Sequence, residues 1–150
     1  KPGSRNSDIV SNLDFAQTFL DIAGVKSPGD MQGGSLVPLF EGHVPKHWRT
    51  HFYYHYYEFP GAHSVARHYG VTNGRHKLIH FYQNNEWELF DLKKDPNELQ
   101  SVYGNSDYKT IQSDLLAELK RLRVHYKVPE EDPVPPKRKR PNQPNRPKKK

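Results

Sequence analysis

Three residues of one short connection, His63, Arg67 and His68, carry side chains suited to bind an anion or a sugar. They follow the turn signal Pro60-Gly61, so their polar groups can project from the edge of a predicted sheet, the usual position of a binding loop. The guanidinium of Arg67 is always charged, and its planar fork of donors fits sulfate or carboxylate oxygens. The alternative, of equal weight, is a structural Arg67 paired with Glu58 and two solvated histidines.

Four histidines, His43, His47, His51 and His55, recur at intervals of four residues and would form a stripe of metal ligands on one continuous helix. Pro45 and the β-favouring run that follows argue against such a helix. On a strand, two residues that are four apart lie about 13 Å from each other, too far to share one ion. We therefore expect no metal site here.

Composition excludes several other kinds of chemistry. The chain has no Cys, so it can form no disulfide, thiolate zinc site or cysteine nucleophile. No apolar run reaches the roughly 18 residues that a membrane span requires. We interpret Arg75 and Lys77 as a solvated end of the sheet and Trp87 as a core anchor, and we assign no catalytic residue.

The positive charge of the chain lies in its last fourteen residues. Residues 137–150 hold eight Lys and Arg and no acid, and subtracting them from the formal net charge of +6 leaves −2 for the rest. This segment could hold an anionic polymer as a nonspecific electrostatic arm. It lacks an aromatic residue for base stacking, so we do not expect nucleic acid as a partner.

The hydrophobic pattern predicts an α+β fold. Apolar residues from Leu13 to Ala23 share one face of a predicted helix over 12–23, with Ser11 and Asp14 as its capping residues and Asp21 exposed. Aromatic and alternating runs, with a hairpin signal at Asn73-Gly74, predict a four-stranded antiparallel sheet. A long C-terminal helix carries an apolar stripe that suits one sheet face. The expected strands cover 51–58, 67–72, 75–82 and 86–90, and the expected second helix covers 107–126.

These elements suggest three parts. Residues 1–50 hold a helix and an irregular connection, residues 51–128 form the α+β unit, and residues 129–150 are a Pro-, Lys- and Arg-rich tail that we expect to be disordered. The chain starts at Lys1-Pro2-Gly3 rather than at Met, which is typical of the interior of a longer protein. We expect it to be a C-terminal piece.

Five blocks, in this order, resemble the C-terminal part of formylglycine-dependent sulfatases. They are SNLDFAQTFLDIAGV, MQGGSLVPLF, YYEFPGAHSVARHYGV, GRHKLIHFY and EWELFDLKKDPNEL. The last is the most specific, because it follows the family pattern W-x-L-[YF]-D-L-x-x-D-P-x-E. The blocks most resemble those of bacterial members similar to N-sulfoglucosamine sulfohydrolases and N-acetylglucosamine-6-sulfatases, which act on sulfated glycans. One departure is Thr72, where relatives commonly carry an Arg.

The resemblance implies a division of labour. In this family a large N-terminal α/β domain, similar to alkaline phosphatase, supplies the formylglycine and the calcium ligands, and neither motif occurs in this chain. The resemblance implies that the smaller subdomain, a four-stranded antiparallel sheet packed by a long helix, borders the substrate cleft. His63, Arg67 and His68 are then the expected substrate-binding residues, with no catalytic residue and no metal ligand in the chain.

We therefore expect the C-terminal part of a sulfatase that hydrolyses sulfate esters or N-sulfates of a glycan. Its partners would be the glycan and the missing N-terminal catalytic domain, and the piece alone would be inactive. The resemblance also implies a periplasmic or secreted protein. The alternative is a non-catalytic binding module, or a degenerate sulfatase-like scaffold, that holds an anionic polymer through the basic tail.

Overall fold

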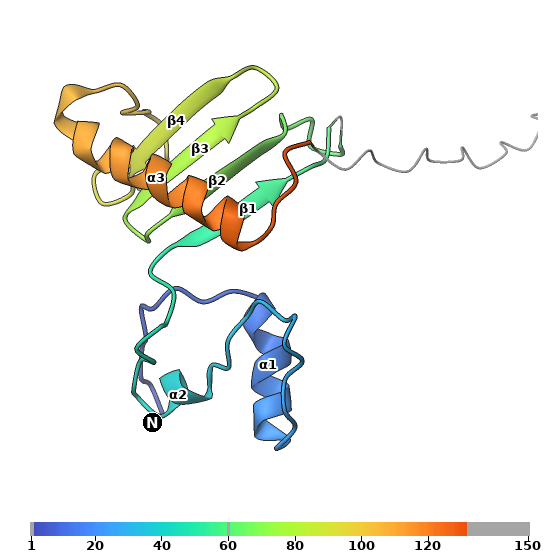
Figure 1. Ribbon diagram of the computed structural model, residues 1–150. Helices are drawn as coiled ribbons and strands as arrows, with labels where there is room; N and C mark the ends of the chain where they lie inside the picture. Colours follow the sequence, from blue (N-terminus) through green and yellow to red (C-terminus); the bar gives the residue numbers. More distant parts are fainter. Residues whose placement is uncertain (1, 60, 132–150) are drawn as a thin grey trace, which may run out of the picture.

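The computed structural model describes residues 2–59 and 61–131 of the chain (Figure 1). A small helical part precedes a sheet that is crossed on one face by a long helix. The elements are α1 (Leu13–Ile22), α2 (Val37–Phe40), β1 (Phe52–Tyr56), β2 (His68–Thr72), β3 (His76–Phe81), β4 (Glu86–Asp91), the 3₁₀ turn η1 (Ser106–Tyr108) and α3 (Lys109–His125).

The sheet is the antiparallel meander that the sequence predicts, with strand order β1-β2-β3-β4. Its register places Tyr56 opposite His68 and Val71 opposite Leu78. In the turn between β2 and β3, the side chain of Asn73 accepts hydrogen bonds from two following amides, and Gly74 takes a positive φ of 86°. The predicted hairpin is confirmed, as are the four strands to within two residues at each end.

The hydrophobic core lies between α3 and one face of the sheet. Because side chains alternate along a strand, Val71, Leu78 and Leu89 meet on this face, and all three are fully buried. The apolar stripe of α3 covers them at spacings of four and three residues. It consists of Leu115, Leu119 and Leu122. The predicted packing of the C-terminal helix on the sheet is therefore confirmed.

The opposite face of the sheet has close backbone packing at one point. A Cβ on Gly70 would lie 2.5 Å from the carbonyl oxygen of Leu78 and 2.6 Å from the hydroxyl of Tyr54. Only glycine leaves room there for the Tyr54 ring to cross β2. Lys77, on the same face, pairs with Glu98 at 2.6 Å instead of standing in solvent as the sequence suggested.

Asp91 ties the end of β4 to its surroundings. The residue is 3% exposed, and its carboxylate accepts hydrogen bonds from Arg75, the Lys93 amide and the Tyr108 hydroxyl. The Arg75 hydrogen bonds hold the pKa of Asp91 well below its ordinary range, against the opposing effect of burial. The prediction that Arg75 is solvated was incomplete, because half of its side chain is exposed while its guanidinium forms this ion pair.

Helix α1 is buried on its polar side. Asp14 is 0% exposed, whereas Phe19 on the apolar side is 70% exposed. The buried Asp14 carboxylate accepts hydrogen bonds from both Nη atoms of Arg49 and from the amides of Ser11 and Gly34. Asp14 thus accepts from the Ser11 amide as a capping-box acid does, but the Asp14 amide bonds to the Ser11 backbone oxygen rather than to its predicted side-chain cap. No sequence pattern predicted that Asp14 also anchors Arg49, 35 residues away.

Three further expectations concern absent features or the tail. The described helices include none that is both long and apolar enough to cross a membrane. The described residues also hold no group of three or more acidic or His side chains placed to bind a metal ion. The prediction of a disordered tail over 129–150 falls, from residue 132 onward, outside the described residues.

Candidate substrate-binding loop

The connection between β1 and β2, residues 57–67, lies at the same end of the sheet as the turn between β3 and β4. The two are joined, because the Arg67 amide donates a 3.1 Å hydrogen bond to the side-chain oxygen of Gln83. Ser64 at the tip has a φ of 52°, a left-handed conformation that is uncommon outside glycine. The loop is therefore tied to the rigid sheet at its base, while its tip adopts an unusual turn.

His68 is held firmly at the start of β2. Its Nδ1–H donates to the Ala66 carbonyl oxygen at 2.8 Å, and a carbonyl can only accept, so Nδ1 carries the proton. Whenever the ring carries only this proton, Nε2 is free to accept a hydrogen bond. The imidazole is stacked with Tyr56, at 5.4 Å between ring centroids, and meets the edges or faces of Tyr54 and Phe81. This cluster lies on the sheet face opposite α3.

Two tyrosine hydroxyls beside His68 have no hydrogen-bond partner among the described residues. They belong to Tyr54 and Tyr56, and both oxygens are buried. Burial raises the pKa of Tyr54 well above its ordinary value, so its hydroxyl stays protonated and able to donate. A buried donor that lacks an acceptor is costly, about 1–3 kcal/mol. These two hydroxyls are therefore well suited to a partner or ligand that supplies oxygen atoms.

Arg67 and His63 occupy different surroundings from His68. The Arg67 Nη2 donates to the Phe59 carbonyl at 3.4 Å, so its guanidinium lies along the inner side of the loop. His63 is exposed. Consecutive residues of an extended chain project to opposite sides, which separates Arg67 from His68. The structure thus brings His68 together with Tyr54 and Tyr56, and leaves His63 and Arg67 on the loop.

Sequence reasoning did not select Tyr54 and Tyr56 as site residues. The signal was present in the alternation, because both share a face of β1, and the antiparallel register places Tyr56 directly opposite His68. The register itself could not be read from the sequence, since the length of the connecting loop does not fix it.

Comparisons with known proteins agree on the class of this fold. The model of the family described as "N-sulphoglucosamine sulphohydrolase, C-terminal" matches residues 1–125. An N-acetylglucosamine-6-O-sulfatase of Bacteroides thetaiotaomicron is 48% identical over 130 residues, which are 85% of this chain and 23% of that protein. A Δ4,5-hexuronate-2-O-sulfatase of the same organism is 32% identical over 122 residues, which are 76% of this chain and 23% of that protein.

A solved structure gives the same result in three dimensions. A protein in complex with its substrate D-glucosamine-2-N,6-O-disulfate matches with a TM-score of 0.74 and 47% identity, over 78% of this chain and 24% of that one. The fold is therefore that of a sulfatase C-terminal subdomain. The chain belongs to the N-sulphoglucosamine sulphohydrolase C-terminal family, and it spans about a quarter of the length of the relatives that it matches.

Proposed function

We propose that this chain is the substrate-shaping part of a sulfatase that hydrolyses sulfate esters or N-sulfates of a glycan. The observation that carries the proposal is the family match over residues 1–125, together with 48% identity to an N-acetylglucosamine-6-O-sulfatase. A neighbour at 47% identity has D-glucosamine-2-N,6-O-disulfate as its substrate, so a sulfated glucosamine is the first substrate to test.

The residues of the loop end have the chemistry that such a substrate needs. His63, Arg67 and His68 are the proposed substrate-binding residues, with Arg67 as the group that meets a sulfate or carboxylate oxygen. The buried hydroxyls of Tyr54 and Tyr56 would donate to oxygen atoms of the sugar or of a domain that covers this face. The proposed role of His63, Arg67 and His68 is to position the sugar.

The partner is proposed to be an N-terminal catalytic domain that covers α1. This helix exposes half or more of the side chains of Leu13, Phe15, Phe19 and Ile22, while it buries Asp14. Exposed apolar side chains gathered on one short helix are typical of a protein interface. A catalytic domain that packed on these side chains would place its catalytic residues close to this chain.

That catalytic domain would also supply the formylglycine and the calcium ion. This chain offers neither group a place: it has no Cys and no Ser-x-Pro-x-Arg segment, and its described residues contain no cluster suited to a metal. We further propose a periplasmic or secreted location, which rests on the family resemblance alone.

The test is sulfate release by the full-length protein that carries this chain. Purified protein is incubated with D-glucosamine-2-N,6-O-disulfate, and free sulfate is measured by ion chromatography. We expect turnover that is lost when the upstream formylglycine precursor residue is replaced. A folded protein whose upstream part carries that residue, and which releases no sulfate from this or other sulfated glucosamines, would favour the non-catalytic binding module.

A further inference from the structure

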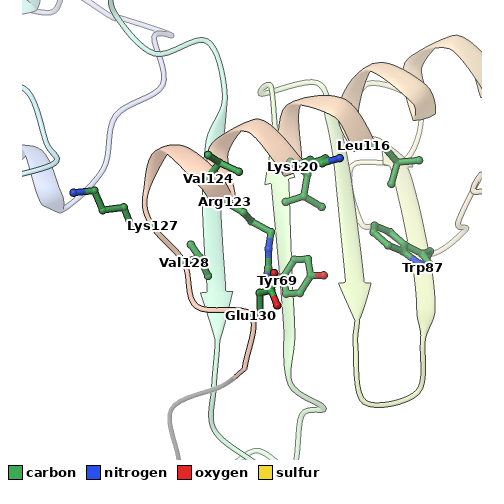
Figure 2. A pocket seen from close by; sticks show the side chains of 10 residues that line it. Tyr69, Trp87, Leu116, Lys120, Arg123, Val124, Lys127, Val128 and Glu130 are labelled. Carbon is green, nitrogen blue, oxygen red and sulfur yellow. The ribbon is translucent and has the colours of Figure 1, made fainter.

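A groove lies on the other face of the sheet, the face that α3 covers (Figure 2). It has a volume of about 410 Å³ and runs between the C-terminal half of α3, the segment that follows α3, and the strands below. Tyr69 and Trp87 form part of its floor. The consecutive residues His68 and Tyr69 point to opposite faces of β2, so this groove is separate from the substrate-binding loop.

The rim of the groove is cationic. Lys120 and Arg123 line it from α3, and Glu130 is the one acid among the described residues that line it. The guanidinium carbon of Arg123 lies 4.1 Å from the centroid of the Tyr69 ring, which holds the flat fork in place. Figure 2 shows Arg123 reaching from α3 toward Tyr69, with Glu130 on the segment that follows α3.

Arg123 has unused hydrogen-bonding capacity. Its Nη2 donates to the Pro129 carbonyl at a long 3.4 Å, and its Nη1 is buried with no hydrogen-bond partner among the described residues. An unpaired donor on a charged group is costly, and an anionic oxygen relieves that cost best. Glu130 also lines the groove, and its negative charge would repel a ligand anion there.

The floor is aromatic and rigid. Trp87 is stacked on His80 at 3.9 Å and lies near Tyr103, and Tyr69 is stacked with Tyr82. The ring edges left open in this way carry partial positive charge, so together with the cationic rim they suit a ligand that has peripheral negative charges. Sulfated and carboxylated sugars carry such charges.

We propose that this groove is an anchoring site for the chain of an anionic polysaccharide, distinct from the loop at which the reacting sugar is positioned. The inference rests on the proposed function for its choice of glycan. Its occupant is a segment of the same polymer, away from the reacting unit. Holding the polymer at a second point raises the effective concentration of its sulfate groups at the loop.

The test compares a long and a short substrate with the full-length protein. The probes are a heparin-derived decasaccharide and D-glucosamine-2-N,6-O-disulfate, and the variants are Lys120→Gln, Arg123→Gln and the double substitution. We expect KM for the decasaccharide to rise about threefold to tenfold in the double variant. KM for the monosaccharide should stay unchanged, and Glu130→Gln should lower KM for the decasaccharide.

Lys109→Gln is the matched control, because Lys109 is an exposed cation of the same helix that does not line the groove. All variants keep residues 137–150, so the contribution of that basic segment is common to them. An unchanged KM for the decasaccharide, or an equal rise for both probes, would overturn the anchoring site.

If neither probe releases sulfate, the proposed function fails and the groove is judged by binding alone. Calorimetry then measures the Kd of the decasaccharide. A Kd that weakens about threefold to tenfold in the double variant, but not in Lys109→Gln, supports the site. An equal Kd for wild type and double variant overturns it.

Discussion

Replacing Asp14 by Asn should release the segment that packs against α1. The carboxylate is fully buried and accepts the Arg49 fork and the amides of Ser11 and Gly34, so all of its neighbours are donors. The pKa of Asp14 is lowered because the hydrogen bonds from Arg49 and from the two amides outweigh the effect of burial. An Asn side chain keeps one acceptor oxygen but turns an NH₂ group toward these donors.

The size of the effect follows from the burial of both partners. The Arg49 side chain is only 16% exposed, so the substitution leaves a largely buried charge without its counter-ion. Removing one partner of a buried ion pair costs about 3–5 kcal/mol. If the substitution lowers the free energy of local opening by this amount, amide protection near the pair should drop by about a hundredfold or more.

Hydrogen exchange followed by mass spectrometry measures this in the full-length protein. The informative peptide covers residues 31–40, because the Gly34 amide bonds to Asp14 and the Leu36 amide bonds to the Thr18 hydroxyl. Asp21→Asn is the control, since Asp21 lies on the same helix but is exposed, and among the described residues its carboxylate accepts a hydrogen bond from the Ser35 hydroxyl. It should change protection by less than about fivefold. Protection within threefold of wild type in Asp14→Asn would refute the anchoring role.

Two further predictions concern the sheet. Gly70→Ala should lower the free energy of unfolding by about 1–3 kcal/mol, because its Cβ would meet Leu78 and Tyr54, whereas Gly29→Ala, in open space, should leave the urea midpoint unchanged. The lowered pKa of Asp91, caused first by Arg75, means that the folded state binds fewer protons than the unfolded state at acid pH. This stabilisation is complete above the ordinary carboxyl pKa of about 3.9 and is lost as pH falls below it. The melting temperature should therefore fall more steeply between pH 6 and pH 2 for wild type than for Asp91→Asn. An equal fall in the two proteins would contradict this.

The sheet and α3 were predictable because their signals are local. Alternating residues in the strands, the turn at Asn73-Gly74 and the leucine stripe of α3 each specify one element and its buried face. Pairing neighbouring strands through short turns then leaves the meander as the simplest topology. The structure differs from these expectations only at element ends, where assignments vary by one or two residues.

Helix α1 shows where sequence reasoning reached its limit. The apolar stripe correctly predicted a helix, but in the described chain it is the opposite, polar side that is buried. Asp14 meets Arg49 only after an irregular stretch of the chain, and no periodic pattern encodes such a contact. The apolar side remains exposed, which is the expected result if a further domain packs there.

The candidate site divides in the same way. His63, Arg67 and His68 could be selected by residue type and by their place after a turn, but their contacts could not. His68 depends on the register that sets it against Tyr56, and Arg67 depends on the path of the loop past Phe59. These are properties of the folded backbone, and residue types alone do not predict them.

The most direct test of the central claim is kcat/KM for sulfate release by Arg67→Ala in the full-length protein. If Arg67 contacts the sulfated sugar, removing its charge-assisted hydrogen bonds should raise the transition-state free energy by about 1.5–3 kcal/mol, with Arg67→Lys intermediate. Arg5→Ala, which removes an exposed charge from the N-terminal segment, should leave kcat/KM unchanged. A wild-type kcat/KM in a folded Arg67→Ala protein would remove Arg67 from the substrate site and contradict the assignment of the loop.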